Sequence, residues 1–114
     1  DYKTGKPKSR NHIIGGTKAV DSGNYFRQLV FYKMLLNLEG KYTMKSGVID
    51  FIQPKDNGKY VKEVFEITST DIDTLMKEIE HMVQDVLTLS FWDVRCDKHR
   101  TGECEYCRLR DAMQ

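Results

Sequence analysis

The 114-residue sequence contains few cysteines, few prolines and almost no excess of charge. It has three cysteines and two prolines, and its 18 lysines and arginines nearly balance its 17 acids, which leaves a net charge of +1. An odd number of cysteines argues against a secreted disulfide scaffold and favours a metal site or cytosolic thiols. A charge near zero excludes a strong overall field, so a polyanionic partner would have to bind a local basic patch.

Long apolar runs are missing as well. No stretch approaches the ~20 apolar residues that span a bilayer, and the first residues lack the pattern of a signal peptide. We therefore expect a cytoplasmic protein without a membrane partner. The strand-like Asp1-Tyr2-Lys3 opens the sequence without a polar leader, and the length suits one domain or part of one. We expect the chain to be a piece of a longer protein.

Apolar residues at helical spacing predict a long helix in the first half of the chain. The apolar stripe runs over residues 24–38, Gly40 can end the helix, and Asp21 or Ser22 can cap its start. The apolar face is broad, so we expect this helix to lie across a sheet. The preceding residues, 7–23, are polar and contain glycines, which predicts a loop.

The second half of the chain predicts a β-hairpin and a second helix. Residues 47–52 and 59–68 are rich in apolar strand formers, and Asn57-Gly58 supplies a tight turn between them. A hydroxyl cap and early acids then predict a helix over residues 69–87, with one apolar stripe along it.

These elements together predict an α/β fold in the order strand, helix, hairpin, helix and tail. We expect a mixed sheet flanked by helices. The core is expected to occupy residues 1–90, and residues 91–114 form a tail that contains the cysteines.

An acid and an amine stand two residues apart at the start of the chain. In a strand, Asp1 and Lys3 would point to the same face, where the carboxylate could bind a divalent cation and the amine could orient a water. The same spacing recurs at Glu39-Gly40-Lys41, so the spacing alone is equally compatible with a solvated ion pair.

The predicted first helix bears a second polar pair. Gln28 and Tyr32 are four residues apart, so they share one helix face. Tyr32 also belongs to the apolar stripe, and Gln28 could simply border it. The pair is therefore weak evidence when it is taken alone.

The combination of the two pairs is more specific. Asp-Tyr-Lys-Thr-Gly-Lys, then about twenty residues and a helix with Gln-x-x-x-Tyr, resembles the PD-(D/E)XK nuclease superfamily. Within that superfamily it looks most like the RecB-type nuclease domain of UvrD-like helicase–nucleases, and the resemblance covers nearly the whole chain. It implies part of a restriction-endonuclease-like core, and DNA as the partner.

The resemblance also implies roles for the matching residues. Asp1, helped by the Tyr2 carbonyl, would bind Mg²⁺ or Mn²⁺, and Lys3 would position the attacking water near the scissile phosphate. Gln28 would support the water network or Lys3, and Tyr32 would face the DNA or brace the site. Such a cation lowers the pKa of water and offsets charge on the phosphate oxygens.

The sequence departs from the family pattern in its acidic ligands. Family members have another metal-binding acid on the preceding strand, and often a His or Glu on an earlier helix, and neither is found here. We therefore expect the isolated chain to be inactive, although its parent would be an ATP-dependent helicase and exonuclease of DNA repair and recombination. The parent would supply the missing helicase and N-terminal nuclease portions. The unpaired edge of the first strand also predicts self-association.

The cysteine-bearing tail leaves three alternatives open. Cys96, His99, Cys104 and Cys107 have a spacing that suits a four-ligand zinc site. Relatives often hold an iron–sulfur cluster here, but only Cys104-x-x-Cys107 matches that pattern. The third alternative is a set of reduced cysteines without metal.

The loop after the first strand is basic. Lys6, Lys8 and Arg10 lie close to the expected site, and the resemblance makes phosphate contact their expected role. A solvated loop is the alternative. Two other functions also remain possible at this point, namely a non-catalytic module that binds DNA or protein, and a small zinc-stabilised interaction domain.

Overall fold

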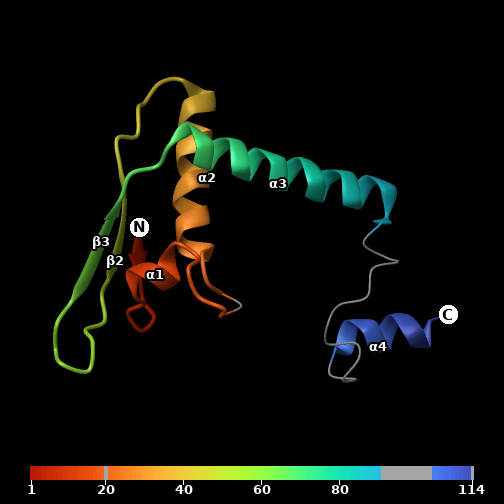
Figure 1. Ribbon diagram of the computed structural model, residues 1–114, viewed down its shortest axis with the longest axis horizontal. Coiled ribbons are helices and arrows are strands. Elements are labelled where there is room, and N and C mark those ends of the chain that lie inside the picture. The colour runs from red at the N-terminus through yellow and green to blue at the C-terminus, as the bar shows by residue number, and fades with distance from the viewer. Residues whose placement is uncertain (20, 91–103, 114) are drawn as a thin grey trace. The chain divides into compact units, whose positions relative to one another are not determined.

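The computed structural model describes residues 1–19, 21–90 and 104–113 (Figure 1). The chain divides into two compact units, residues 1–77 and 78–114. The expected boundary between residues 90 and 91 stays a prediction. Among the helices of the described residues, none has the length and apolar character that crossing a membrane requires.

The first unit is built on a three-stranded mixed sheet. Its strands are β1 (Tyr2–Lys3), β2 (Gly47–Phe51) and β3 (Val61–Phe65), in the order β1-β2-β3. β1 runs parallel to β2, and β3 is antiparallel to β2. The predicted α/β fold with a mixed sheet and flanking helices is thereby confirmed.

Helix α2 (Asn24–Glu39) connects β1 to β2 and packs on one face of the sheet (Figure 1). Because side chains alternate along a strand, β2 points Ile49 and Phe51 to this face, and both are fully buried. Leu29 and Val30 of α2 are almost as buried. Burial of these apolar side chains is the main force that holds the helix on the sheet.

The ends of α2 agree only in part with the sequence-based expectation. The helix ends at Gly40, whose φ of 72° gives the left-handed C-cap that glycine favours. The N-cap is Gly23, and no side chain caps the helix there. The expectation that Asp21 or Ser22 caps α2 was wrong, because Gly23 itself turns the chain into the helix with a φ of 85°.

The expected loop over residues 7–23 contains a short helix, α1 (Arg10–Ile13). Ser9 caps this helix by accepting a hydrogen bond from the His12 amide at 3.2 Å. Ile13 is fully buried and anchors the segment to the core. A helix of one turn has no repeated apolar pattern, which is why the sequence indicated only a loop.

The hairpin is present, with strands shorter than expected. Lys55 and Gly58 close the turn, with the Gly58 amide donating to the Lys55 carbonyl at 2.8 Å. Gly58 has a φ of 77°, so it supplies the left-handed residue that the reversal needs.

The remaining helices are α3 (Ser69–Thr88) and α4 (Glu105–Ala112). The start of α3 is capped one residue earlier than expected. Thr68 Oγ1 accepts from the Asp71 amide at 3.2 Å, and Asp71 Oδ2 accepts from the Thr68 amide at 2.7 Å. This reciprocal pair is a capping box. The apolar stripe of α3 is mostly exposed, and only Leu75 is buried.

Candidate active site

Asp1 and Lys3 lie side by side on the α2 face of the sheet. The parallel ladder extends over both residues, because Asp1 accepts from the Asp50 amide at 3.0 Å and Lys3 from the Ile52 amide at 3.1 Å. Lys3 lies opposite the buried Phe51, which fixes the face to which its side chain points. Lys3 Nζ is 2.8 Å from Asp1 Oδ2, and the two side chains are only 13% and 18% exposed.

Helix α2 supplies two further contacts to the Lys3 ammonium. Lys3 Nζ donates a hydrogen bond to Gln28 Oε1 at 2.5 Å. The same nitrogen lies 4.6 Å from the centre of the Tyr25 ring, within the range of a cation–π contact. Tyr25 in turn packs against Phe51, with ring centres 6.0 Å apart. The carboxylate, the amide and the ring together fix the position of the ammonium.

Tyr25 is a site residue that the sequence analysis missed. It was counted as one member of the apolar stripe, and its ring does pack on the core. The available signal was its position three residues before Gln28, which places both side chains on one helix face.

The oxygen donors around Lys3 match the preference of Mg²⁺ and Mn²⁺ for hard ligands. Asp1 offers a carboxylate. The Tyr2 carbonyl points away from β2, because the carbonyls of Asp1 and Lys3 on either side of it both point toward β2. The number of acids is small, since no three His, Cys, Asp or Glu residues cluster within the described residues. The oxygen donors at this site are therefore of the type that Mg²⁺ and Mn²⁺ prefer. Asp1 is the carboxylate among them.

Tyr32 lies one helical turn beyond Gln28 and lines a different cavity. This cleft of about 570 Å³ lies between α2 and the amino end of β2, and Asp1 also borders it. Leu29, Leu36 and Met44 give the cleft an apolar wall. Tyr32 is 39% exposed, so its ring is accessible from this cleft.

Two of the three basic loop residues are engaged in ion pairs. Lys8 Nζ is 3.2 Å from Asp21, and the hydrogen bond from Lys8 holds the pKa of Asp21 below its ordinary value. Arg10 bonds Glu63 at 2.8 Å and the Val64 carbonyl at 3.0 Å. Both side chains therefore hold the loop in place. Their contact with phosphate stays a prediction.

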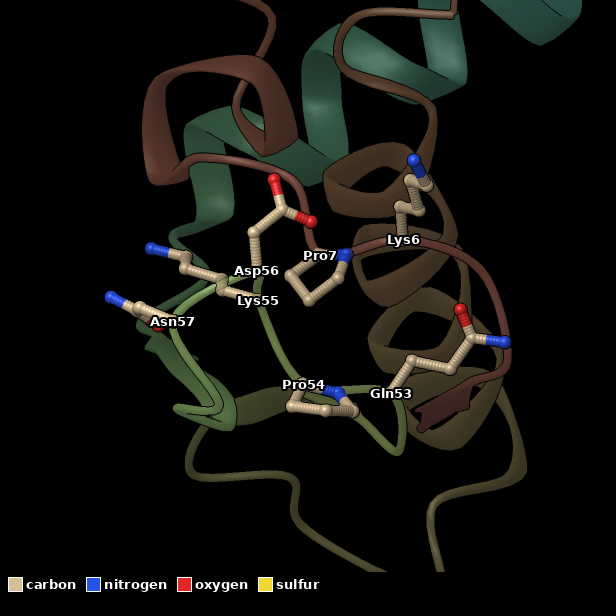
Figure 2. A pocket seen from close by; sticks show the side chains of 7 residues that line it. All are labelled: Lys6, Pro7, Gln53, Pro54, Lys55, Asp56 and Asn57. Carbon is tan, nitrogen blue, oxygen red and sulfur yellow. The ribbon is translucent and has the colours of Figure 1, made fainter.

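Lys6 is differently placed. It makes no ion pair or hydrogen bond with any other described residue, and it lines a polar cleft near the end of β1 (Figure 2). Of the three basic residues, its amine is the most available for a ligand.

The cysteine tail lies largely outside the described residues. Cys96 and His99 are among the residues that the structure does not describe, so the zinc, iron–sulfur and metal-free alternatives all stay open. Cys104 is the N-cap residue of α4 and is half-buried, while Cys107 is buried.

Comparison with known protein families identifies the superfamily of the chain. The model of the PD-(D/E)XK nuclease superfamily matches residues 1–112, and the chain belongs to this superfamily. The mixed sheet with flanking helices is consistent with the fold of that superfamily. Membership indicates nuclease activity with DNA as the substrate class. Neither the curated proteins nor the solved structures gave a significant match.

Proposed function

We propose that this chain forms the part of a metal-dependent DNA nuclease domain that holds the Asp1-x-Lys3 motif. The observation that supports this most strongly is the position of the Lys3 ammonium, which contacts both Asp1 and Gln28. These groups come from residues up to 27 positions apart in a chain that belongs to a nuclease superfamily. An accidental surface ion pair would not explain the additional amide contact from α2.

Each residue has a distinct role in this proposal. Asp1 and the Tyr2 carbonyl would hold Mg²⁺ or Mn²⁺. When bound, such a cation lowers the pKa of a water and offsets negative charge on the phosphate. Lys3 has one N–H left after its contacts with Asp1 and Gln28, and this donor would position the attacking water near the scissile phosphate. Gln28 and Tyr25 keep Lys3 in position, and Tyr32 contacts the DNA from the adjacent cleft.

The proposal includes a larger protein. We infer a RecB-type nuclease domain in a UvrD-like helicase and exonuclease of DNA repair and recombination, located in the cytoplasm. The helicase motor would hydrolyse ATP, and the N-terminal nuclease portion would supply a further acid. A single carboxylate binds Mg²⁺ weakly, so we expect the 114-residue chain to be inactive by itself. The open edge of β1 makes self-association of this chain a further expectation.

Metal binding by the 114-residue chain tests the assignment of Asp1. Asp1→Asn should weaken Mn²⁺ binding by about 10-fold or more, since it removes the carboxylate ligand. Asp50→Asn is the matched control, because Asp50 lies on the opposite face of the sheet and pairs with Lys62 at 3.4 Å. Calorimetric titration measures both. Equal affinities for the two variants would contradict the assignment.

Cleavage assays test the assignment of Lys3. In the larger protein, Lys3→Ala should lower the rate of Mg²⁺-dependent DNA cleavage by about 10²–10³-fold. Gln28→Ala should lower it less, because Gln28 acts through Lys3. Unchanged cleavage by Lys3→Ala would overturn the proposal. Robust cleavage by the pure 114-residue chain, abolished by Lys3→Ala, would instead show that no further acid is needed.

A zinc-stabilised interaction domain would be favoured if the cysteines bound zinc and Gln28 pointed away from Lys3. Gln28 accepts a hydrogen bond from Lys3, which counts against that alternative. Elemental analysis of untagged protein would test separately whether the cysteines bind metal.

A further inference from the structure

A polar cleft of about 530 Å³ lies where β1 and β2 leave the sheet. The Ile52 amide donates to the Lys3 carbonyl at 3.1 Å, so the residues after Lys3 and after Ile52 diverge from the same point. The carboxyl ends of parallel strands are a common position for ligands in α/β sheets. Figure 2 shows the residues that line the cleft, which are Lys6, Pro7, Gln53, Pro54, Lys55, Asp56 and Asn57.

Prolines and hydrogen bonds restrict the backbone on the hairpin side of this cleft. Both prolines of the chain, Pro7 and Pro54, line it and restrict the backbone on either side. The hairpin tip is fixed by hydrogen bonds from the Lys55 amide to the Lys59 carbonyl at 2.8 Å, and from the Lys59 amide to Asn57 Oδ1 at 3.1 Å. A ligand would therefore lose little free energy in ordering the hairpin side of the cleft.

The polar side chains of the cleft include two cations and two amides. Lys6 and Lys55 are cations without an ion-pair partner among the described residues, and Gln53 and Asn57 add side-chain amides. Asp56 is the only acid in the lining, so the net charge is positive. In Figure 2 the side chains of Lys6 and Lys55 lie at opposite edges of the cleft, and their amines point outward from it. This separation suits an extended chain of phosphates better than a single small anion.

We propose that this cleft binds the sugar–phosphate backbone of a DNA strand next to the position of cleavage. The inference builds on the proposed function. Lys6 follows Lys3 by three residues, so their Cα atoms are at most about 11 Å apart. A strand that contacts Lys3 therefore needs only a few nucleotides to reach Lys6, because each nucleotide advances at least about 3.4 Å along the strand. A strand with its scissile phosphate at Lys3 therefore places a neighbouring phosphate at the cleft.

Salt-dependent DNA binding tests the proposal. The 114-residue chain is titrated onto a fluorescent single-stranded oligonucleotide in EDTA, and anisotropy gives the affinity over a range of NaCl concentrations. Each phosphate contact adds about 0.7 to the slope of log affinity against log salt. Lys6→Ala/Lys55→Ala should thus reduce the slope by about 1.4, which lowers the affinity at ~0.1 M salt by about 25-fold.

Two further variants sharpen the test. Lys62→Ala/Lys77→Ala removes the same charge from exposed positions that line neither this cleft nor the cleft beside Tyr32, and should leave the slope unchanged. Asp56→Asn removes the one acid and should tighten binding by about 5-fold at ~0.1 M salt. All these side chains are exposed, so the variants should fold, and circular dichroism checks this.

The outcomes separate the two proposals. A slope reduced only by Lys6→Ala/Lys55→Ala, with tighter binding by Asp56→Asn, supports the cleft as a phosphate site. If both double variants behave alike while the unaltered chain still binds DNA, the cleft proposal is overturned and the nuclease assignment stands. If the unaltered chain shows no salt-dependent binding and the larger protein does not cleave DNA, both proposals fail.

Discussion

The sheet face under α2 and the segment of residues 4–22 are held in place by different forces. Under α2, apolar side chains such as Leu29, Ile49 and Phe51 are at most 2% exposed. In the segment, Ile13 is the only buried side chain among the described residues, and most contacts are polar. Those contacts join Arg10 to Glu63, Lys8 and His12 to Asp21, and Thr17 to Ser22.

The apolar core under α2 therefore provides stability, and the polar segment is the part that can adapt. Apolar burial depends little on salt or pH, whereas exposed ion pairs are screened by salt and lost when one partner changes its charge. The core can therefore keep β1 and α2, and with them Lys3 and Gln28, in a fixed relation. The polar segment, which follows β1 directly, can adjust to a charged ligand without loss of that core.

The largest expected effect comes from breaking the apolar core. Phe51→Ala should lower the free energy of unfolding by about 3–5 kcal/mol, because it removes a fully buried ring beneath Tyr25. Denaturant titration measures the loss. Tyr2→Ala is the control, since Tyr2 is also aromatic but 75% exposed, and its effect should stay within about 0.5 kcal/mol. A loss below about 1 kcal/mol for Phe51→Ala would contradict the comparison.

The junction between the two regions is expected to be the next most sensitive. At Gly23, which has a φ of 85°, an added Cβ would lie 3.1 Å from the Gly15 Cα. Gly23→Ala should therefore lower the free energy of unfolding by about 1–3 kcal/mol. Gly5→Ala is the matched control, because nothing lies within 4 Å of its added Cβ. Thermal unfolding compares the two, and equal midpoints would show that the junction is not tightly packed.

Arg10 tests the polar segment itself. Arg10→Ala removes the ion pair with Glu63, the bond to the Val64 carbonyl and the contact with the Phe65 ring at 4.4 Å. The free energy of unfolding should fall by about 1–2 kcal/mol, and by less at high salt. Arg10→Lys keeps the charge but loses the planar group, so it should recover only part of the loss. If the loss of unfolding free energy did not depend on salt, Arg10 would stabilise the fold mainly through apolar contact, as the core residues do.

The smallest effect is expected at Asp21. The folded-state pKa of Asp21 lies below its ordinary value of 3.8, chiefly because Lys8 hydrogen-bonds to it. Its contribution to stability is therefore complete above pH 3.8 and disappears as the pH falls through the lowered folded-state value. The free energy of unfolding is measured by denaturant titration above and below pH 3.8. Asp21→Asn should have a lower value than the unaltered chain only at the higher pH. A difference between Asp21→Asn and the unaltered chain that is the same at every pH would contradict this assignment.

The sequence predicted the apolar region better than the polar one. The stripe before Gly40 gave both the extent of α2 and its position on the sheet, because burial leaves a repeated pattern. The polar segment has no such pattern, so α1 was missed and the start of α2 was assigned to a side chain instead of Gly23. The contacts there join residues far apart in the sequence, such as Arg10 and Glu63, and composition does not reveal them.

The candidate site could be predicted only in part. Strand alternation placed Asp1 beside Lys3, and the structure has both on one face. The proximity of Gln28 to Lys3 came from the family resemblance, since spacing alone relates no strand residue to a residue on a distant helix. Tyr25 was hidden within the apolar stripe. The polar cleft could not be foreseen, because it needs the relative positions of Lys6 and the hairpin tip.

The parallel pairing of β1 with β2 has a consequence for the order in which the chain folds. The bond from the Asp1 nitrogen to the Val48 carbonyl joins residues 47 positions apart, whereas the β2–β3 hairpin closes over a short turn. Closing a long stretch of chain costs more entropy, so the hairpin can form early and β1 docks late. The Asp50 and Ile52 amides, which donate to β1, should accordingly gain protection from hydrogen exchange after those of the hairpin. Asp1 and Lys3 would then reach their final positions only when the rest of the sheet is already built.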